Sequence, residues 1–256
     1  MSKQFEDKVV VVTGAASGIG RAAAVAFGQQ GAKVVVSDVA TQGGEETVRL
    51  LKNAGGEATF VPCDASQSKE VERLISTTVT TYGRLDYAVN NAGIEGVLAT
   101  VVDYPEEVWQ KVINVNLTGP WLCMKYEIPQ MLKQGKGAIV NMASILGVVG
   151  FATASAYTAA KHGLIGLTQV AALEYAAQGI RVNAVCPGFI ETPMVMQRGI
   201  AASTHPEAYQ QLAALHPIKR LGKPEEIAEA VVWLCSDASS FVTGISLLVD
   251  GAYTAQ

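Results

Sequence analysis

The feature that most constrains the fold is a stretch near the N-terminus in which a strand pattern runs directly into a glycine-rich turn and a helix. Val9–Thr13 is a continuous run of β-branched residues, as in a parallel strand covered on both faces. Gly14, Gly18 and Gly20 punctuate the turn, and an alanine-rich helical pattern follows it to about residue 31. Glycines let the backbone approach a phosphate group closely, and a helix N-terminus attracts its charge. This stretch therefore favours an α/β fold that binds a dinucleotide.

The glycine spacing, Gly-x-x-x-Gly-x-Gly, differs from the usual Gly-x-Gly-x-x-Gly fingerprint, so a turn without a ligand stays open as an alternative. The next predicted strand, residues 33–37, argues against it because the strand ends on Asp38. An acidic side chain there hydrogen-bonds the adenosine ribose and repels a 2′-phosphate, by about 4 kcal/mol per unit charge at ~4 Å and a dielectric constant of ~20. Neither Ser17 nor Val39 supplies a compensating cation, and Arg21 is expected on the helix surface. The sequence predicts NAD rather than NADP.

Helix and strand patterns alternate to the end of the chain, which predicts a doubly wound parallel sheet of about seven strands with helices on both faces, in one domain over residues 1–256. Predicted helices cover residues 41–53, 68–82 and 224–235, and further predicted strands cover residues 59–63, 85–90, 138–142, 181–185 and 245–249. Residues 189–217 have no sheet pattern, and a long connection at the carboxyl end of a strand predicts a lid over the substrate.

Polar residues follow two of these strands. Asp64 comes directly after the strand at 59–63, and Asn90 ends the strand at 85–90 and begins the sequence Asn-Asn-Ala-Gly. Side chains just past the carboxyl ends of parallel strands line the crevice where such sheets bind ligands. We therefore expect Asp64 to meet the adenine, and Asn90 with its backbone neighbours to meet the ribose. Taken alone, Asn-Asn-Ala-Gly is equally typical of a simple turn.

Ser144, Tyr157 and Lys161 fall where a predicted strand passes into a long helix that begins at Ser155. Tyr157 and Lys161 are four residues apart and share a helix face. A phenol with a pKa of about 10 needs roughly 3 to 4 kcal/mol of stabilisation to act as a base near neutral pH. An ammonium group at ~5 Å contributes about 3 kcal/mol at a dielectric constant of ~20, and the Ser144 hydroxyl can bind the same substrate oxygen. These side chains predict proton transfer at a carbonyl or alcohol carbon.

The pair Tyr157 and Lys161 is weak evidence alone, because a structural tyrosine followed by a surface lysine is common in helices. The N-terminal stretch is what favours the catalytic interpretation. Between residues 106 and 134, Asn114 and Asn116 interrupt a helical pattern. A buried asparagine in a helix needs a partner for its amide, so one of the two is expected to hold a water or a backbone group near Lys161, with purely structural satisfaction as the alternative.

Composition and charge exclude several classes of protein. With 49% hydrophobic residues among 256, the chain can bury a large core. A net charge of -4 without a basic cluster argues against nucleic acid and anionic membranes as partners. The first residues are polar and no apolar run reaches membrane-spanning length, so a cytoplasmic location is expected. The three histidines form no metal-ligand pattern and no metal is predicted. Four scattered cysteines are expected to be buried free thiols: Cys63, Cys123, Cys186 and Cys235.

Six motifs in order make the chain resemble the short-chain dehydrogenase/reductase family over about residues 6–252. They are the glycine-rich turn at residues 13–20, Asp64, Asn-Asn-Ala-Gly at residues 90–93, Asn116, Ser144 with Tyr157 and Lys161, and Pro187-Gly188. The resemblance implies a single-domain Rossmann-type fold. It implies Tyr157 as catalytic acid or base, Ser144 as anchor of the substrate oxygen, and Lys161 as activator of Tyr157 and ligand of the nicotinamide ribose. It also implies Asn116 as holder of a proton-relay water.

The same resemblance implies the cofactor contacts, with Thr192 next to the carboxamide, and a homotetramer built through the two long helices and the last strand. Cys186 departs from the family pattern, in which Asn or Ala is usual, and Ala252 replaces the second glycine of a closing Asp-Gly-Gly. Neither departure touches a catalytic role. The cofactor-binding residues are expected to be Gly14, Ser17, Gly18, Ile19, Gly20, Asp38, Asp64, Ala65, Asn90, Ala92, Gly93, Tyr157, Lys161, Pro187, Gly188, Ile190 and Thr192.

We therefore predict an NAD-dependent oxidoreductase that interconverts a secondary alcohol and a ketone by hydride transfer. One alternative is an NADPH-dependent 3-oxoacyl-carrier-protein reductase, against which Asp38 argues, and another is a catalytically silent NAD-binding scaffold. Glu95 is the charged exception in a mostly apolar pocket and either binds a polyol or an amine or faces solvent. The expected pocket walls, which suit a lipophilic or medium-sized substrate, are Ile94, Glu95, Leu146, Val148, Phe151, Met194, Val195 and Met196.

Overall fold

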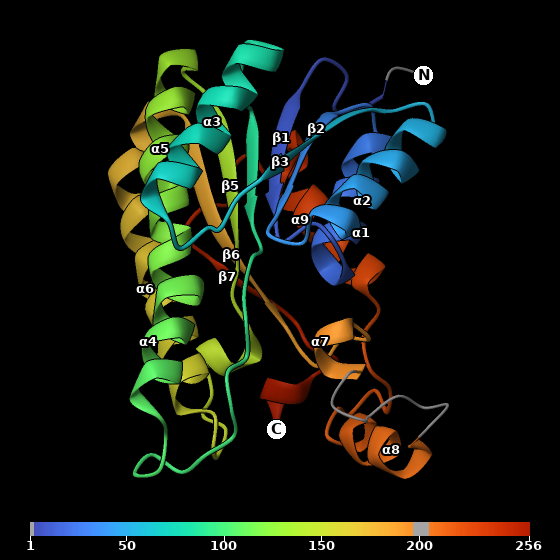
Figure 1. Ribbon diagram of the computed structural model, residues 1–256, viewed down its shortest axis with the longest axis vertical. Coiled ribbons are helices and arrows are strands. Elements are labelled where there is room, and N and C mark those ends of the chain that lie inside the picture. The colour runs from blue at the N-terminus through green and yellow to red at the C-terminus, as the bar shows by residue number, and fades with distance from the viewer. Residues whose placement is uncertain (1–2, 197–204) are drawn as a thin grey trace.

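Seven parallel strands form one sheet at the centre of the molecule, in the order β3-β2-β1-β4-β5-β6-β7 (Figure 1). The computed structural model describes residues 3–196 and 205–256. The chain leaves β1 toward one edge of the sheet and returns beside it with β4, so the carboxyl ends of β1 and β4 flank a crevice. The predicted doubly wound fold is confirmed. The strands are β1 (Val9–Thr13), β2 (Lys33–Asp38), β3 (Glu57–Pro62), β4 (Tyr87–Asn90), β5 (Gly137–Met142), β6 (Ile180–Pro187) and β7 (Ser246–Val249).

Helices cover both faces of this sheet, as Figure 1 shows. One face carries α1 (Gly18–Gln29), α2 (Thr41–Asn53) and α9 (Pro224–Cys235), and the other carries α3 (Ser68–Tyr82), α4 (Glu106–Ile113), α5 (Gly119–Gln134) and α6 (Ser155–Tyr175).

The two faces explain the unbroken apolar run of β1. Val10 and Val12 pack among the core residues of α1 and α9, whereas Val11 packs among those of α3 and α5. Because side chains alternate between the faces of a strand, a strand covered on both sides needs an apolar residue at every position.

The predicted bounds of α2, α3, α9 and β1 are confirmed, and the bounds of the other strands differ by one or two residues. Strand β4 begins at Tyr87 rather than at the predicted residue 85. The reason is tertiary: the N–H of Leu85 donates to the side-chain carbonyl of Gln134, and the Leu85 carbonyl accepts from the amide of the same side chain. The Leu85 backbone is thus satisfied by α5 rather than by a neighbouring strand.

The predicted interruption between residues 106 and 134 is a π-helical turn, Asn114–Thr118, between α4 and α5. The Asn114 side chain accepts from the amide of Gln110 at 2.7 Å on the surface. Asn116 is completely buried and points toward the crevice side of the molecule, where its partner is a loop backbone. The two asparagines therefore have different roles, and only Asn116 concerns the site.

The segment predicted as a lid, residues 189–217, contains α7 (Pro193–Met196) and α8 (Pro206–Ala214). Residues 197–204 of this prediction lie outside the described residues. In Figure 1, α7 and α8 lie in the lower half of the molecule, across from α4. The described residues of the segment join no strand, and an isolated backbone bridge pairs Ile190 with Gly222.

All four cysteines are buried free thiols, which confirms that prediction. In the part of the chain that the structure describes, no helix is long and apolar enough to cross a membrane. Within the same residues, no group of three or more His, Cys, Asp or Glu side chains could hold a metal ion.

A buried polar network lies between the sheet and α5. Glu127 is fully buried, and its carboxyl accepts from the amide of Asn90 at 3.1 Å. The Asn90 amide also donates to Asn141 of β5 at 3.0 Å, and Asn141 in turn donates to Thr168 of α6. Burial raises the pKa of Glu127 to about 8, against the opposing effect of the Asn90 hydrogen bond. Glu127 is therefore largely neutral at pH 7.

Replacing Glu127 by Gln is expected to remove a pH-dependent loss of stability. A carboxyl whose pKa rises from 4.5 in the unfolded chain to about 8 in the folded chain destabilises the fold progressively as pH rises through that interval. The stability of Glu127→Gln relative to the natural chain should therefore increase by about 1 kcal/mol per pH unit between pH 5 and 8. Urea unfolding at several pH values measures it. The exposed Glu229→Gln is the matched control, and an equal slope in both variants would contradict the prediction.

Candidate active site at the carboxyl ends of the strands

The glycine-rich turn after β1 packs backbone to backbone against the Asn-Asn-Ala-Gly turn after β4. Gly14 has φ +65°, and a Cβ there would lie 2.8 Å from the Cα of Ala92. A Cβ on Gly20 would overlap the carbonyl oxygen of Gly14. Ser17 begins α1 without a side-chain capping bond, and the first helical turn contains no acidic residue. The cradle therefore fits a pyrophosphate, because its uncapped N–H groups and its dipole attract an anion.

Asn91 ties the two turns together. Its side-chain amide donates to the carbonyl oxygens of Thr13 at 3.0 Å and Gly14 at 3.1 Å. In return, the Thr13 hydroxyl accepts from the backbone N–H groups of Asn91 and Ala92. The sequence analysis did not assign Asn91 a role of its own. Its position directly past a strand end was the available signal.

Asp38 lies beside the glycine-rich turn at the end of β2. Its carboxylate accepts from the N–H of Ala16 and from the N–H of Ala40, each at 2.9 Å. Arg21 is partly exposed on α1, as expected, but its side chain is not free in solvent. Arg21 is half-buried, and its guanidinium donates to the carbonyl of Ala16 and to Gly43 and Thr47 of α2. These bonds hold the guanidinium against the start of α2.

Asp64 and Ala65 follow β3. The Asp64 carboxylate accepts from the N–H and the hydroxyl of Ser66, and the Asp64 N–H donates to Glu70 of α3. Asp64 is half-buried. Ala65 is buried against Gly119, where a Cβ would lie 3.3 Å from the Ala65 carbonyl oxygen.

The side chain of Asn90 does not reach the crevice, so the predicted contact of Asn90 with a cofactor falls to its backbone. Asn90 is 2% exposed and points into the core, toward Glu127 and Asn141. The physical reason is strand alternation: Asn90 lies on the same face of β4 as Ala88, whose neighbours belong to α3 and α5. Only the backbone of Asn90 is left to meet a ligand at the strand end.

Lys161 is the buried charge of the site. It is 3% exposed, its Nζ donates to the carbonyl oxygen of Met142 at 2.6 Å, and the same Nζ lies 5.4 Å from the centre of the Tyr157 ring. Burial lowers the pKa of Lys161 to about 8. At neutral pH most of the lysine is therefore still protonated, one helical turn below the phenol.

Ser144 and Asn116 complete the group around Tyr157. The Ser144 hydroxyl accepts from the N–H of Leu146 at 3.1 Å and so begins the short 3₁₀ turn Ile145–Gly147. The Asn116 side chain accepts from the N–H of Ile94 at 2.8 Å and donates to its carbonyl at 2.6 Å. Of the two partners that the sequence left open, a water or a backbone group, the Asn116 side chain takes the backbone group.

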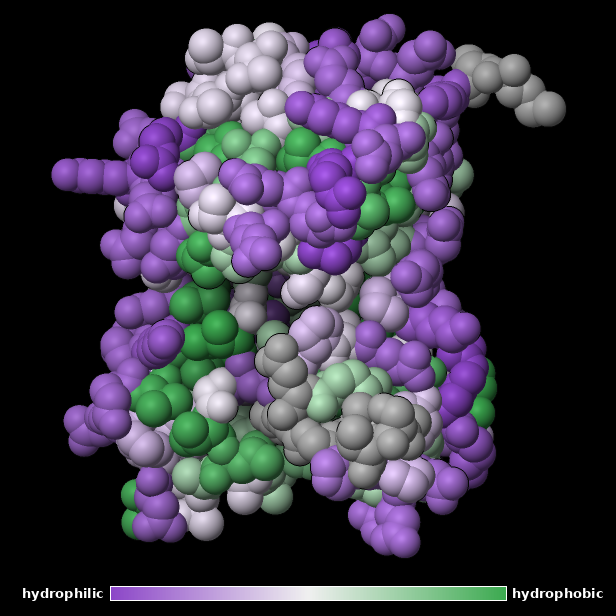
Figure 2. All heavy atoms as spheres, turned by 45° about the vertical axis from the view of Figure 1, so that its right-hand side comes forward, coloured by the Kyte–Doolittle hydropathy of each residue, from purple (hydrophilic) through white to green (hydrophobic). Residues whose placement is uncertain are grey.

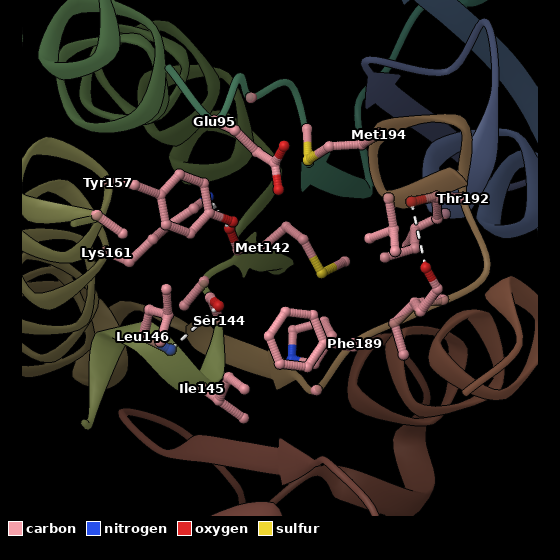
Figure 3. A pocket seen from close by; sticks show the side chains of 18 of the residues that line it. Glu95, Met142, Ser144, Ile145, Leu146, Tyr157, Lys161, Phe189, Thr192 and Met194 are labelled. Carbon is pink, nitrogen blue, oxygen red and sulfur yellow. Dashed lines mark hydrogen bonds between the residues drawn. The ribbon is translucent and has the colours of Figure 1, made fainter. Parts of the chain in front are cut away.

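A single cavity brings three of the polar residues described above together with the turn after β6 (Figure 3). Ser144, Tyr157 and Lys161 line it from β5 and α6, and Pro187, Gly188, Ile190 and Thr192 line it from the end of β6. A Cβ on Gly18 would lie 3.3 Å from the Thr192 side chain, so this turn closes against the start of α1. The end of the glycine-rich turn and the three polar side chains thus open into one space.

The remaining walls of the cavity are mostly apolar. Glu95, Leu146, Phe151, Met194 and Val195 line it as predicted, with Glu95 pointing into the space in Figure 3. Figure 2 shows one group of hydrophobic side chains at the lower left of this face of the molecule and others in its upper half. Ile94, Val148 and Met196 were predicted as walls and are not among the lining residues. Six apolar walls were not predicted: Leu98 lies in an irregular loop, and the other five lie within three residues of predicted site residues, namely Met142, Ala143, Ile145, Ala154 and Phe189.

Comparison with known proteins places the chain among oxidoreductases. A sequence model of the family described as enoyl-(acyl carrier protein) reductase matches residues 14–254. The chain is 44% identical to a cyclohexanol dehydrogenase of Acinetobacter sp. (strain SE19), over all of this chain and 98% of the relative. It is 46% identical to a cis-4-hydroxycyclohexanecarboxylate dehydrogenase of Sinomonas cyclohexanicum, over the full length of both. The crystal structure of an NAD+-bound xylitol dehydrogenase superposes with a TM-score of 0.92 at 34% identity, covering 97% of this chain and all of the other.

Replacing Asn91 by Ala is expected to weaken dinucleotide binding about tenfold, since a buried carbonyl that loses its partner costs about 1–3 kcal/mol and the turn that holds the pyrophosphate is no longer fixed. Quenching of protein fluorescence by NADH measures the dissociation constant. Gln110→Ala, which removes an exposed amide from α4, is the control. Unchanged affinity in Asn91→Ala would show that the turn keeps its shape without this bond.

Proposed function

This chain belongs to the short-chain dehydrogenase/reductase family of oxidoreductases that act on CH–OH donors, and from that premise we propose that it interconverts a secondary alcohol and a ketone with NAD. The observation that carries the proposal is the buried ammonium of Lys161 beside the ring of Tyr157, in a cavity that Ser144 also lines. NAD supplies the hydride acceptor or donor at its nicotinamide.

Tyr157 is the proposed acid or base. A cation at ~5 Å stabilises a phenolate by about 3 kcal/mol at a dielectric constant of ~20, and Lys161 provides that cation from one helical turn away. In the oxidative direction the Tyr157 oxygen accepts the proton of the substrate hydroxyl, while the Ser144 hydroxyl binds the same oxygen. In the reductive direction Tyr157 returns the proton to the carbonyl oxygen. Since Lys161 loses its proton as pH rises through about 8, its help to the phenolate declines above that pH.

Asn116 and the turn after β6 have positioning roles in this proposal. Asn116 fixes the backbone of Ile94, next to Glu95 in the cavity wall. The N–H of Thr192 donates to the carbonyl of Ile190 at 2.7 Å, which folds the turn that would hold the carboxamide end of NAD. A proton relay through a water at Asn116 stays part of the proposal, carried by the family resemblance.

A small alicyclic alcohol is the substrate class that we propose. The walls contributed by Leu146, Phe151 and Met194 are apolar and suit a hydrocarbon ring. Two relatives with more than two fifths of their residues in common carry names for dehydrogenases of ring alcohols. Cyclohexanol and cyclohexanone are therefore the substrates to test.

Three further properties belong to the proposal. Asp38 selects NAD over NADP, which also argues against a 3-oxoacyl-carrier-protein reductase that uses NADPH. The chain forms a homotetramer in the cytoplasm, and exposed apolar residues such as Trp121 of α5 and Leu173 of α6, 46% and 84% exposed, support the helix-mediated contact. Residues 189–196, the described first part of the segment predicted as a lid, cover the substrate within a single domain.

Replacing Tyr157 by Phe is expected to lower kcat for cyclohexanol oxidation at least 100-fold and leave NADH binding unchanged, because general acid–base catalysis contributes about 10²- to 10⁴-fold and the phenyl ring keeps its packing. NADH absorbance follows turnover and fluorescence follows binding. Tyr175→Phe, at the far end of the same helix, should keep full activity. Turnover at the natural rate in Tyr157→Phe would remove Tyr157 from the mechanism.

Replacing Asp38 by Asn is expected to raise the ratio of kcat/KM for NADP over NAD at least tenfold, because the repulsion of a 2′-phosphate is worth several kcal/mol at ~4 Å. Asn has one acceptor oxygen, so it can keep one of the two hydrogen bonds that Asp38 accepts from the N–H groups of Ala16 and Ala40. Initial rates with the two cofactors at saturating cyclohexanol measure the ratio. Glu45→Gln, an exposed carboxylate of α2, is the control for loss of one negative charge. An unchanged ratio would mean that Asp38 does not face the ribose.

A further inference from the structure

The turn that follows β6, residues 188–191, forms a partition between two cavities. Gly188, Phe189 and Ile190 line the cavity that contains Tyr157 and Ser144. The same three residues also line a second cavity of about 340 Å³, on the other side of the turn, together with His216 and Asp250. Because there is open space on both sides of this turn, its position depends on the hydrogen bonds that the turn itself makes.

Among the described residues, four hydrogen bonds tie backbone groups of the partition to other segments, and three of them join backbone to backbone. The N–H of Gly188 donates to Val249 of β7 at 3.1 Å. The carbonyl of Phe189 accepts from the N–H of Gly222 at 3.0 Å, and the N–H of Glu191 donates to the Gly222 carbonyl at 2.9 Å. The fourth tie comes from a side chain: the N–H of Phe189 donates to Nε2 of His216 at 3.1 Å.

His216 is built into this place. The side chain is 2% exposed, and its ring lies edge-on to Phe189 at 5.7 Å and against Tyr253 at 5.4 Å. A Cβ on Gly188 would lie 2.8 Å from Nε2, so the glycine makes room for the ring. Burial lowers the pKa of His216. This favours the neutral ring, and Nε2 is unprotonated where it accepts from the Phe189 N–H.

Phe189, whose backbone is held by His216, also lines the substrate cavity. Its ring is drawn in the cavity in Figure 3, facing the side from which Ser144 and Tyr157 project. It also contacts Phe151, another wall of the cavity, with ring centres 6.3 Å apart. The depth of the cavity therefore depends on where the backbone of Phe189 is held.

We propose that His216 is a positioning residue for substrate selectivity: by accepting from the Phe189 N–H it holds the Phe189 ring forward, so that the pocket fits a single unsubstituted six-membered ring and disfavours larger alicyclic alcohols. This inference rests on the proposed function. Without the acceptor, the Phe189 wall retreats toward the second cavity and the pocket deepens.

The test compares cyclohexanol with 4-tert-butylcyclohexanol, both as alcohols oxidised with NAD. In His216→Phe, which keeps a ring and removes the acceptor, the ratio of kcat/KM for the larger over the smaller alcohol should rise about tenfold, mainly through KM, since a buried N–H is left unpaired. His216→Gln should keep nearly the natural ratio, because Oε1 of Gln is as many bonds from Cα as Nε2 of His. Tyr253→Phe, which keeps the neighbouring ring, is the control.

A double-mutant cycle separates positioning through Phe189 from general destabilisation. Phe189→Ala should raise the ratio by itself, and adding His216→Phe should raise it no further, since the two changes act on one wall. If His216→Phe does not fold, His216→Asn takes its place, because its amide is one bond too short to reach the Phe189 N–H. An unchanged ratio in the folded variant, equal effects of Phe and Gln at position 216, or additive effects with Phe189→Ala would each overturn the proposal.

Hydrogen exchange keeps this result distinct from the fate of the proposed function. Without substrate, the peptide that covers residues 187–192 should exchange faster in His216→Phe than in His216→Gln, as measured by mass spectrometry. If the natural chain oxidises neither alcohol and this difference is present, the proposed substrate class is wrong and the positioning of the turn stands. If the exchange rates are equal, the positioning role is wrong whatever the activity.

Discussion

A buried ammonium group is the interaction on which the rest of the site depends. The Nζ of Lys161 donates to the Met142 carbonyl at the end of β5 and lies beside the Tyr157 ring. Removing a charge from water is costly, and here burial lowers the lysine pKa to about 8. The remaining charge acts on the phenol through a medium of low dielectric constant, where it is worth more than at the surface. Burial thus lowers the fraction of Lys161 that is protonated, and it also strengthens the effect of each charged Lys161 on the phenol.

Polar side chains that hold loop backbones form a second theme of the molecule. Asn91 binds the glycine-rich turn, Asn116 binds both backbone groups of Ile94, and His216 binds the N–H of Phe189. Each loop carries residues that line the crevice or the cavity. Loops have no neighbouring strand to satisfy their N–H and C=O groups, so a buried side chain takes that role and fixes the loop with it. These bonds hold the irregular loops that form the walls of the site.

Much of this could be anticipated from local pattern. The β-branched run of β1, the glycines after it and the helical periods of α2, α3 and α9 each depend on neighbours in the chain, and they predicted the fold and most of the crevice. Tyr157 and Lys161 share a helix face by periodicity alone. The local pattern was insufficient where contacts with a distant segment of the chain determine the structure. Leu85 is taken out of β4 by Gln134, and no local pattern showed that Gly43 and Thr47 would hold the Arg21 guanidinium.

What the sequence determined by itself is the alternation of elements and the order of the polar residues at strand ends, because both follow from periods of 2 and 3.6 residues and from glycine's freedom at a turn. The alternation of side chains along β4 does not say which face of the strand packs against α5. The inward direction of the Asn90 side chain was therefore decided only by the tertiary structure. The same holds for His216, which lies 27 residues after Phe189. Such a pair meets because separate elements pack on one sheet, and no local period records that contact.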